Sequence, residues 1–186
     1  MSIISIFRGR NGKRDLFHAL LKPHIEILYR MAYRWTQSQA DAEDLVQDIL
    51  VRLAHRVDDM QQVDMLRPWL VKVLYHRYVD LYRRQTSSPI ERERESWQPD
   101  NETFASRLHT IADDHDAIEQ LEMQQILAMA LGQLDEGHRD VVLLHDMEGY
   151  TALEVAEILD INVGTVKSRL HRAREKLKNL LTHGTF

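Results

Sequence analysis

Residues 151–174 read TALEVAEILDINVGTVKSRLHRAR, and this stretch decides the fold of the C-terminal part of the chain. Thr151 and Glu154 have the spacing of a capping box, in which a hydroxyl accepts a free N–H at a helix start and the acid reaches back. A short helix is therefore predicted from Thr151 to about Asp160. A second helix is predicted from Val163, because apolar residues then recur at intervals of three and four. These residues are Val166, Leu170, Ala173, Leu177 and Leu180.

Two short helices joined by a tight turn, with the small residue Ala156 at their crossing, predict a helix-turn-helix. The second helix would expose hydroxyl and basic side chains opposite its buried face: Thr165, Lys167, Ser168, Arg169, Arg172 and Lys176. Hydroxyls and a lysine in the first turn suit base edges, and later arginines suit phosphates. The alternative is a helical hairpin with a solvated basic face.

The rest of the chain also carries helical signals. Its 186 residues are 44% hydrophobic and 28% charged, with four prolines and seven glycines, which is typical of one folded domain or two small ones. The spacing of apolar residues predicts an all-α fold. Helices are predicted over residues 17–35, 40–56, 67–84, 118–134 and 137–147, the last closed by Gly149 as a C-cap.

Residues 86–117 interrupt this pattern. They contain two prolines and eight acidic residues against three basic ones, so we predict a linker between two helical domains. Charge is also segregated, because residues 67–89 carry a net charge of +4 and residues 163–186 carry +5, whereas residues 91–136 carry −9. Two basic segments separated by an acidic one favour two contacts with one polyanion. The alternative is that both are ordinary solvated helix faces.

Several classes of function are disfavoured. The absence of cysteine excludes disulfides, thiolate metal sites and a cysteine nucleophile, and it suits a reducing compartment. The first 14 residues hold too short an apolar run for a signal peptide or a membrane span. We therefore expect a cytoplasmic protein without membrane insertion. No glycine-rich phosphate loop, metal motif or nucleophile-base spacing is present, so no enzyme activity, catalytic residue, metal or cofactor is predicted.

Four blocks of sequence follow one another along the chain: DAEDLVQD at residues 41–48, RPWLVK at 67–72, DLYRR at 80–84 and VGTVKSRLHRAR at 163–174. In this order they resemble the extracytoplasmic-function group of bacterial sigma factors, the promoter-specificity subunits of RNA polymerase. The resemblance implies two helical domains joined by a flexible linker. It divides the chain into a basic N-terminal arm (1–15), sigma region 2 (16–85), an acidic linker (86–117) and sigma region 4 with the helix-turn-helix (118–186).

The resemblance also implies three sets of site residues. The segment that binds core RNA polymerase would comprise Asp41, Glu43, Asp44, Leu45, Gln47 and Asp48. Binding of the minus-10 promoter element would involve Arg67, Trp69, Lys72, Tyr75, His76, Arg77, Arg83 and Arg84. Binding of the minus-35 element would involve Thr165, Lys167, Ser168, Arg169, Arg172 and Arg174.

The chemistry of these residues agrees, although simpler roles stay open. Exposed acids on an amphipathic helix can dock on a basic partner, yet Asp41 and Glu43 would also offset the helix dipole. Aromatic and basic residues together suit single-stranded DNA, yet some of the tyrosines would serve the core equally well. His76 stands where the family very often has Asn, and Asp160 stands where Gly is usual, at a position that Asp tolerates.

The sequence therefore predicts a sigma factor that binds core RNA polymerase, recognises minus-35 and minus-10 promoter DNA and helps to melt it. The resemblance also implies an anti-sigma factor as a further partner. The alternative is a helix-turn-helix regulator that binds duplex operators independently of polymerase. The acidic segment at residues 41–48 and the aromatic residues of the helix at 67–84 count against that alternative.

Overall fold

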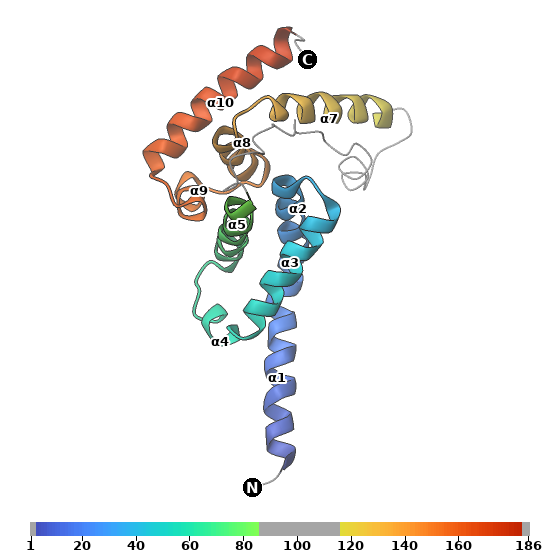
Figure 1. The fold of residues 1–186 in the computed structure, drawn as a ribbon, viewed down its shortest axis with the longest axis vertical. Coiled ribbons are helices and arrows are strands. Elements are labelled where there is room, and N and C mark those ends of the chain that lie inside the picture. The colour runs from blue at the N-terminus through green and yellow to red at the C-terminus, as the bar shows by residue number, and fades with distance from the viewer. Residues whose placement is uncertain (1–2, 86–115, 184–186) are drawn as a thin grey trace. The chain divides into compact units, whose positions relative to one another are not determined.

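The computed structural model consists of helices throughout its described part, residues 3–85 and 116–183 (Figure 1). Side chains are described for residues 12–81, 123 and 125–182. The chain divides into two compact units, Met1–Glu91 and Arg92–Phe186, which confirms the predicted all-α fold with two small domains. The predicted linker at residues 86–117 lies outside the described residues, apart from its last two, which begin α7.

The first unit contains five α-helices and one 3-10 turn in its described part. They are α1 (Ile3–Leu21), η1 (Lys22–His24), α2 (Ile25–Thr36), α3 (Gln39–Ala54), α4 (Val57–Met60) and α5 (Leu66–Gln85). The prediction of one helix over residues 17–35 is wrong, because Pro23 lies at the start of η1 and lacks the N–H that a continuous helix needs. Helix α1 also extends back through most of the predicted N-terminal arm.

Helices α2, α3 and α5 pack on one another to form the core of this unit. The apolar stripe predicted for α3 is confirmed, since Ala42, Leu45, Val46, Ile49 and Leu53 are all buried. On α5, Leu70 and Leu74 are fully buried. Burying one side chain of this kind contributes about 1.5–3 kcal/mol. These stripes therefore set which faces of α3 and α5 stay available to other molecules.

The second unit contains four α-helices and one π-helical turn in its described part. They are α7 (Asp116–Gly132), α8 (Glu136–Val142), η2 (Leu143–Met147), α9 (Ala152–Leu159) and α10 (Val163–His183). Helix α10 packs against α7, α8 and α9. The predicted role of Gly149 in ending the preceding helix is supported by its φ of 75°, which glycine adopts without strain.

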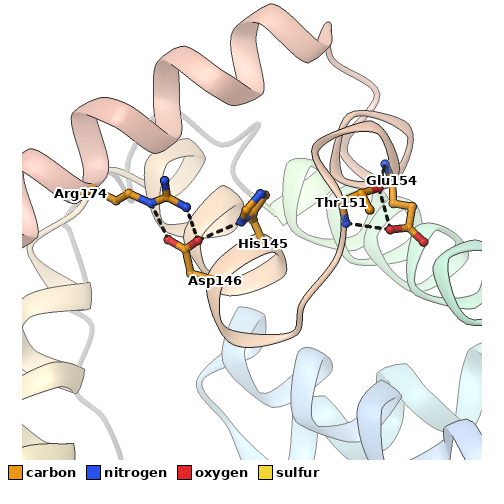
Figure 2. Close-up of polar contacts among 5 residues, drawn as sticks. All are labelled: His145, Asp146, Thr151, Glu154 and Arg174. Carbon is orange, nitrogen blue, oxygen red and sulfur yellow. Dashed lines mark hydrogen bonds and ion pairs between the residues drawn. The ribbon is translucent and has the colours of Figure 1, made fainter.

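The predicted helix-turn-helix is confirmed in detail. The Thr151 hydroxyl accepts a hydrogen bond from the Glu154 N–H at 3.2 Å, and the Glu154 carboxylate accepts one from the Thr151 N–H at 2.7 Å (Figure 2). Asp160 ends α9 in the left-handed conformation, with φ 54°. On α10, Val166, Leu170, Ala173 and Leu177 are buried as predicted, and Leu180 is partly buried.

The capping box gives a direct test of the turn. We expect Thr151→Ala to destabilise the second unit by about 1 kcal/mol, because the Glu154 N–H loses its acceptor at the helix start. Thr151→Ser keeps the hydroxyl and is the matched control, with little change expected. Urea denaturation combined with amide exchange of α9 measures both. Equal protection of α9 in the alanine variant and the parent protein would contradict the prediction.

Candidate nucleic-acid and polymerase interfaces

An open groove of about 510 Å³ lies between α3 and α5 in the first unit. Its lining combines four cations with two ring systems: Arg52, Arg56, Lys72, Arg77, Trp69 and His76. The Arg56 guanidinium lies 5.7 Å from the centre of the Trp69 ring, and it also donates to Asp59 at 2.8 Å. Cations beside an aromatic face suit a ligand that has both a phosphate and a base.

The predicted minus-10 residues do not all lie on this groove. Trp69, Lys72, His76 and Arg77 line it, whereas the Tyr75 ring packs 5.2 Å from Trp35 of α2. Tyr78 stacks on the same tryptophan at 5.8 Å. The tyrosines are therefore part of the contact between α2 and α5, which is one of the two roles that their sequence pattern allowed. Arg67 is exposed at the start of α5, and the side chains of Arg83 and Arg84 lie outside the described residues.

Helix α3 presents an acidic surface away from the core. Asp41, Glu43, Asp44 and Gln47 are exposed there. Leu45 is only 2% exposed, so this residue of the predicted polymerase-binding set supports the helix from inside and offers no surface. Helix α3 begins at a cap in which the Ser38 hydroxyl accepts from the Asp41 N–H at 3.3 Å.

Asp48 differs from the other acids of α3 because it is paired with two arginines of the same unit. Its carboxylate accepts from Arg77 Nε at 2.6 Å, from Arg77 Nη2 at 3.3 Å and from Arg52 Nε at 2.8 Å. Partial burial acts to raise the pKa of Asp48, but the hydrogen bonds and charges of Arg77 and Arg52 outweigh it and lower the pKa below its ordinary value. Asp48 is therefore ionised at neutral pH.

In the second unit, the exposed face of α10 carries part of the predicted minus-35 set. Lys167, Ser168, Arg172 and Arg174 are exposed, and Thr165 is partly exposed. Arg169 instead lies against α8, where a Cβ added to Gly137 would come within 2.9 Å of its Nη1 atom. The small size of Gly137 makes room for this guanidinium.

Arg174 is held by a second ion pair inside the unit. It donates through Nε and Nη2 to the two carboxylate oxygens of Asp146, with Nε at 3.0 Å, and His145 Nδ1 lies 2.9 Å from the same carboxylate (Figure 2). Asp146 belongs to the π-helical turn η2, so the pair ties this turn to α10. The hydrogen bond from Arg174 lowers the pKa of Asp146; partial burial opposes this effect, and His145 adds to it.

One exposed residue of this face was not among those predicted from the sequence. The side chain of His171 is 75% exposed, and it follows Lys167 by one helical turn and precedes Arg172. Its Nε2 atom lies 3.9 Å from a carboxylate oxygen of Glu175. The signal that could have found it is helical spacing, because positions three or four apart share a face with Lys167 and Ser168.

Both units match families of known proteins. Residues 20–88 match the family Sigma-70 region 2, and residues 124–177 match Sigma-70, region 4. The chain is also 30% identical over 180 residues to the RNA polymerase sigma factor CnrH of Cupriavidus metallidurans, covering 94% of this chain and 91% of that protein. The chain belongs to the extracytoplasmic-function sigma factors. It is therefore a polymerase-associated factor that recognises promoters.

Two other relatives are named as extracytoplasmic-function sigma factors. The sigma factor is 26% identical to SigW of Bacillus subtilis, covering 92% of each chain. It is 30% identical to SigE of Mycolicibacterium smegmatis, covering 93% of this chain but 64% of SigE. No helix in residues 3–85 or 116–183 is long and apolar enough to cross a membrane.

Solved structures show the same fold. The structure of CnrH in complex with the cytosolic domain of CnrY aligns with a TM-score of 0.62 at 28% identity, covering 95% of this chain and 94% of that one. The sigma factor RpoE of Bartonella quintana, crystallised with the anti-sigma factor NepR, aligns with a TM-score of 0.65 at 24% identity. That alignment covers 89% of this chain and 96% of RpoE.

The Asp146–Arg174 pair predicts a pH-dependent contribution to stability. Because the pKa of Asp146 is lower in the folded chain, its contribution is complete above the unfolded value of about 4 and is lost as the pH falls through the lowered folded value. We expect Asp146→Asn to lower the urea midpoint of the second unit at pH 7, and the difference from the parent to shrink below about pH 4.

Asp160→Asn is the matched control, since Asp160 is exposed and asparagine also tolerates its left-handed backbone. The control should follow the parent protein at each pH. A deficit of Asp146→Asn that stays constant from pH 7 to pH 3 would show that the ion pair is not its cause.

Proposed function

We propose that the sigma factor divides its tasks between its two units. Residues 16–85 bind core polymerase and the minus-10 element, residues 118–186 bind the minus-35 duplex, and residues 86–117 connect the two. The single observation that carries this proposal is the exposed face of α10, with Lys167, Ser168, His171 and Arg172 in a helix-turn-helix. The matches to sigma regions 2 and 4 support the same division.

On the minus-35 duplex, the first turns of α10 enter the major groove. Lys167, Ser168 and His171 are near base edges there, and Arg172 holds a phosphate. Thr165 borders this surface. Arg169 and Arg174 position α10 through contacts to other helices of the unit, since Arg169 lies against Gly137 and the exposed Arg174 is paired with Asp146.

On the minus-10 element, the groove between α3 and α5 receives the separated strand. Trp69 offers a ring for a base to stack on, while Lys72, Arg77 and Arg56 offer positive charge to phosphates. His76 lies in the groove and is exposed, which supports a direct contact. Holding the strand unstacked favours melting of the promoter. Arg67, Arg83 and Arg84 add positive charge along α5.

The exposed acids of α3, namely Asp41, Glu43 and Asp44 with Gln47, form the surface for core polymerase, whose contacting element must be basic. The factor contributes no chemistry of its own, because bond formation belongs to the polymerase. It works in the cytoplasm, where that enzyme meets the chromosome. An anti-sigma factor is a further partner, as supported by the solved structures of CnrH with the cytosolic domain of CnrY and of RpoE with the anti-sigma factor NepR.

The test of this function is transcription from a genomic promoter library by purified core polymerase, with and without the chain. New start sites that share minus-35 and minus-10 sequences are expected. No new starts, together with a footprint of the chain alone on duplex DNA, would instead favour an operator-binding regulator. The acidic surface of α3 and the groove between α3 and α5 argue against an operator-binding regulator, because binding to duplex DNA alone requires neither of them.

The exposed face of α10 yields a quantitative prediction. Replacing both Lys167 and Arg172 by alanine should weaken binding to a duplex carrying the recovered minus-35 sequence and reduce the slope of log affinity against log salt by about 0.9, since Arg172 is the residue of the two assigned to a phosphate and each phosphate contact contributes about 0.9. Fluorescence anisotropy at several salt concentrations measures the slope. Lys22→Ala removes an exposed charge from the other unit and should leave the slope unchanged. An unaltered slope in the double variant would contradict the phosphate contact of Arg172, and an unaltered affinity would remove both residues from the interface.

A further inference from the structure

Asp48 lies between two surfaces of the first unit. It follows Asp44 by one turn of α3, so it borders the acidic surface assigned above to core polymerase. On its other side it bonds Arg77 and Arg52, and both of these arginines line the groove between α3 and α5. The Asp48 side chain is 33% exposed, so a partner can reach it, whereas that of Arg77 is 20% exposed.

The bonds that Arg77 makes to Asp48 are those that a phosphate would use. A guanidinium offers a planar fork of N–H donors that fits a carboxylate and a phosphate in the same way. Two of these donors, Nε and Nη2, are taken by the two oxygens of Asp48. A phosphate that enters the groove therefore competes with Asp48 for Arg77, and it also meets a positive charge that Asp48 has already offset.

The other acids near the groove do not occupy Arg77 in this way. Asp59 accepts from Arg56, at the Trp69 end of the groove. Asp80 lines the groove and is exposed to solvent. Among the acids of the described residues, Asp48 is the one that contacts two arginines of the groove.

We propose that Asp48 couples the two binding events of the first unit, which rests on the function proposed above. In the free chain Asp48 binds Arg77 and Arg52 and thereby lowers the affinity of the groove for phosphates. When a basic element of core polymerase docks on the acidic surface of α3, it attracts Asp48 and releases both guanidinium groups to the DNA strand. Because such coupling is reciprocal, a strand bound in the groove also strengthens binding of polymerase.

Asp48 is thus a positioning residue, which acts on DNA through Arg77 and Arg52.

The first experiment measures binding of the full-length free chain to a labelled pool of random 12-nucleotide single-stranded DNA by anisotropy. Asp48→Asn should raise the affinity by at least about fivefold, the lower end of typical coupling, and steepen the salt slope by about 0.7 for each further phosphate that the chain neutralises. Asp48→Ala should act in the same direction without leaving an amide near the arginines. Asp15→Asn, which makes the same charge change at an exposed position of α1, should bind like the parent chain.

A double-mutant cycle then isolates the pair. Adding Arg77→Gln should abolish most of the increase in affinity caused by Asp48→Asn, because the released guanidinium is what the strand contacts. With core polymerase, the same oligonucleotide pool should strengthen binding of the parent chain and leave that of Asp48→Asn nearly unchanged.

The outcomes separate this inference from the function on which it rests. Equal affinities of Asp48→Asn and Asp15→Asn for the oligonucleotide would overturn the coupling, even if Lys72→Ala weakens binding and so supports the groove as the strand site. If Lys72→Ala has no effect and the parent holoenzyme also fails to bind the pool, the strand site itself is overturned, and the coupling with it. An increase in affinity that is specific to the Asp48 variants and requires Arg77 supports the proposal.

Discussion

Each unit of this sigma factor depends on burying one narrow apolar face of a single long helix. In the first unit, Leu45 and Ile49 hold α3 against its neighbours, and in the second, Val166 and Leu170 hold α10. A small domain buries only part of its surface, so a helix that buries one apolar stripe leaves its other faces exposed. The exposed remainder is where acids gather on α3 and where basic and hydroxyl residues gather on α10.

Two ion pairs limit which arginines of these helices can bind a partner. Arg77 is held by Asp48 and Arg174 is held by Asp146, in both cases through two donors of one guanidinium. Each pair joins segments far apart in sequence and fixes the rotation of a basic helix within its unit. Arginines that look alike in the sequence therefore divide into those that position a helix and those that are open to a partner, such as Arg172.

Much of the fold was predictable because its signals are local. Periodicity predicts α3, α5 and α10, and the capping box predicts the start of α9 within one residue. The break at Pro23 was overlooked because the apolar pattern continues on both sides of it, although proline removes the N–H on which a continuous helix depends. Of the candidate site, exposed residues such as Lys167 and Asp44 were predictable. The burial of Leu45 also follows from its place in the stripe, whereas His171 was missed although helical spacing reveals it.

By itself, the sequence determined the order of helices, the helix-turn-helix and the charge of each segment, since these depend on residues within a few turns of one another. Only the tertiary structure decided the partners of Tyr75, Asp48, Arg169 and Arg174. Their contacts lie on other helices, up to 40 residues away for Tyr75, and helix packing rather than local preference brings those helices together. The physical reason is that the periodicity of a sequence indicates which face of its own helix a side chain occupies. Which residues that face contacts depends on the neighbouring helix that packs against it.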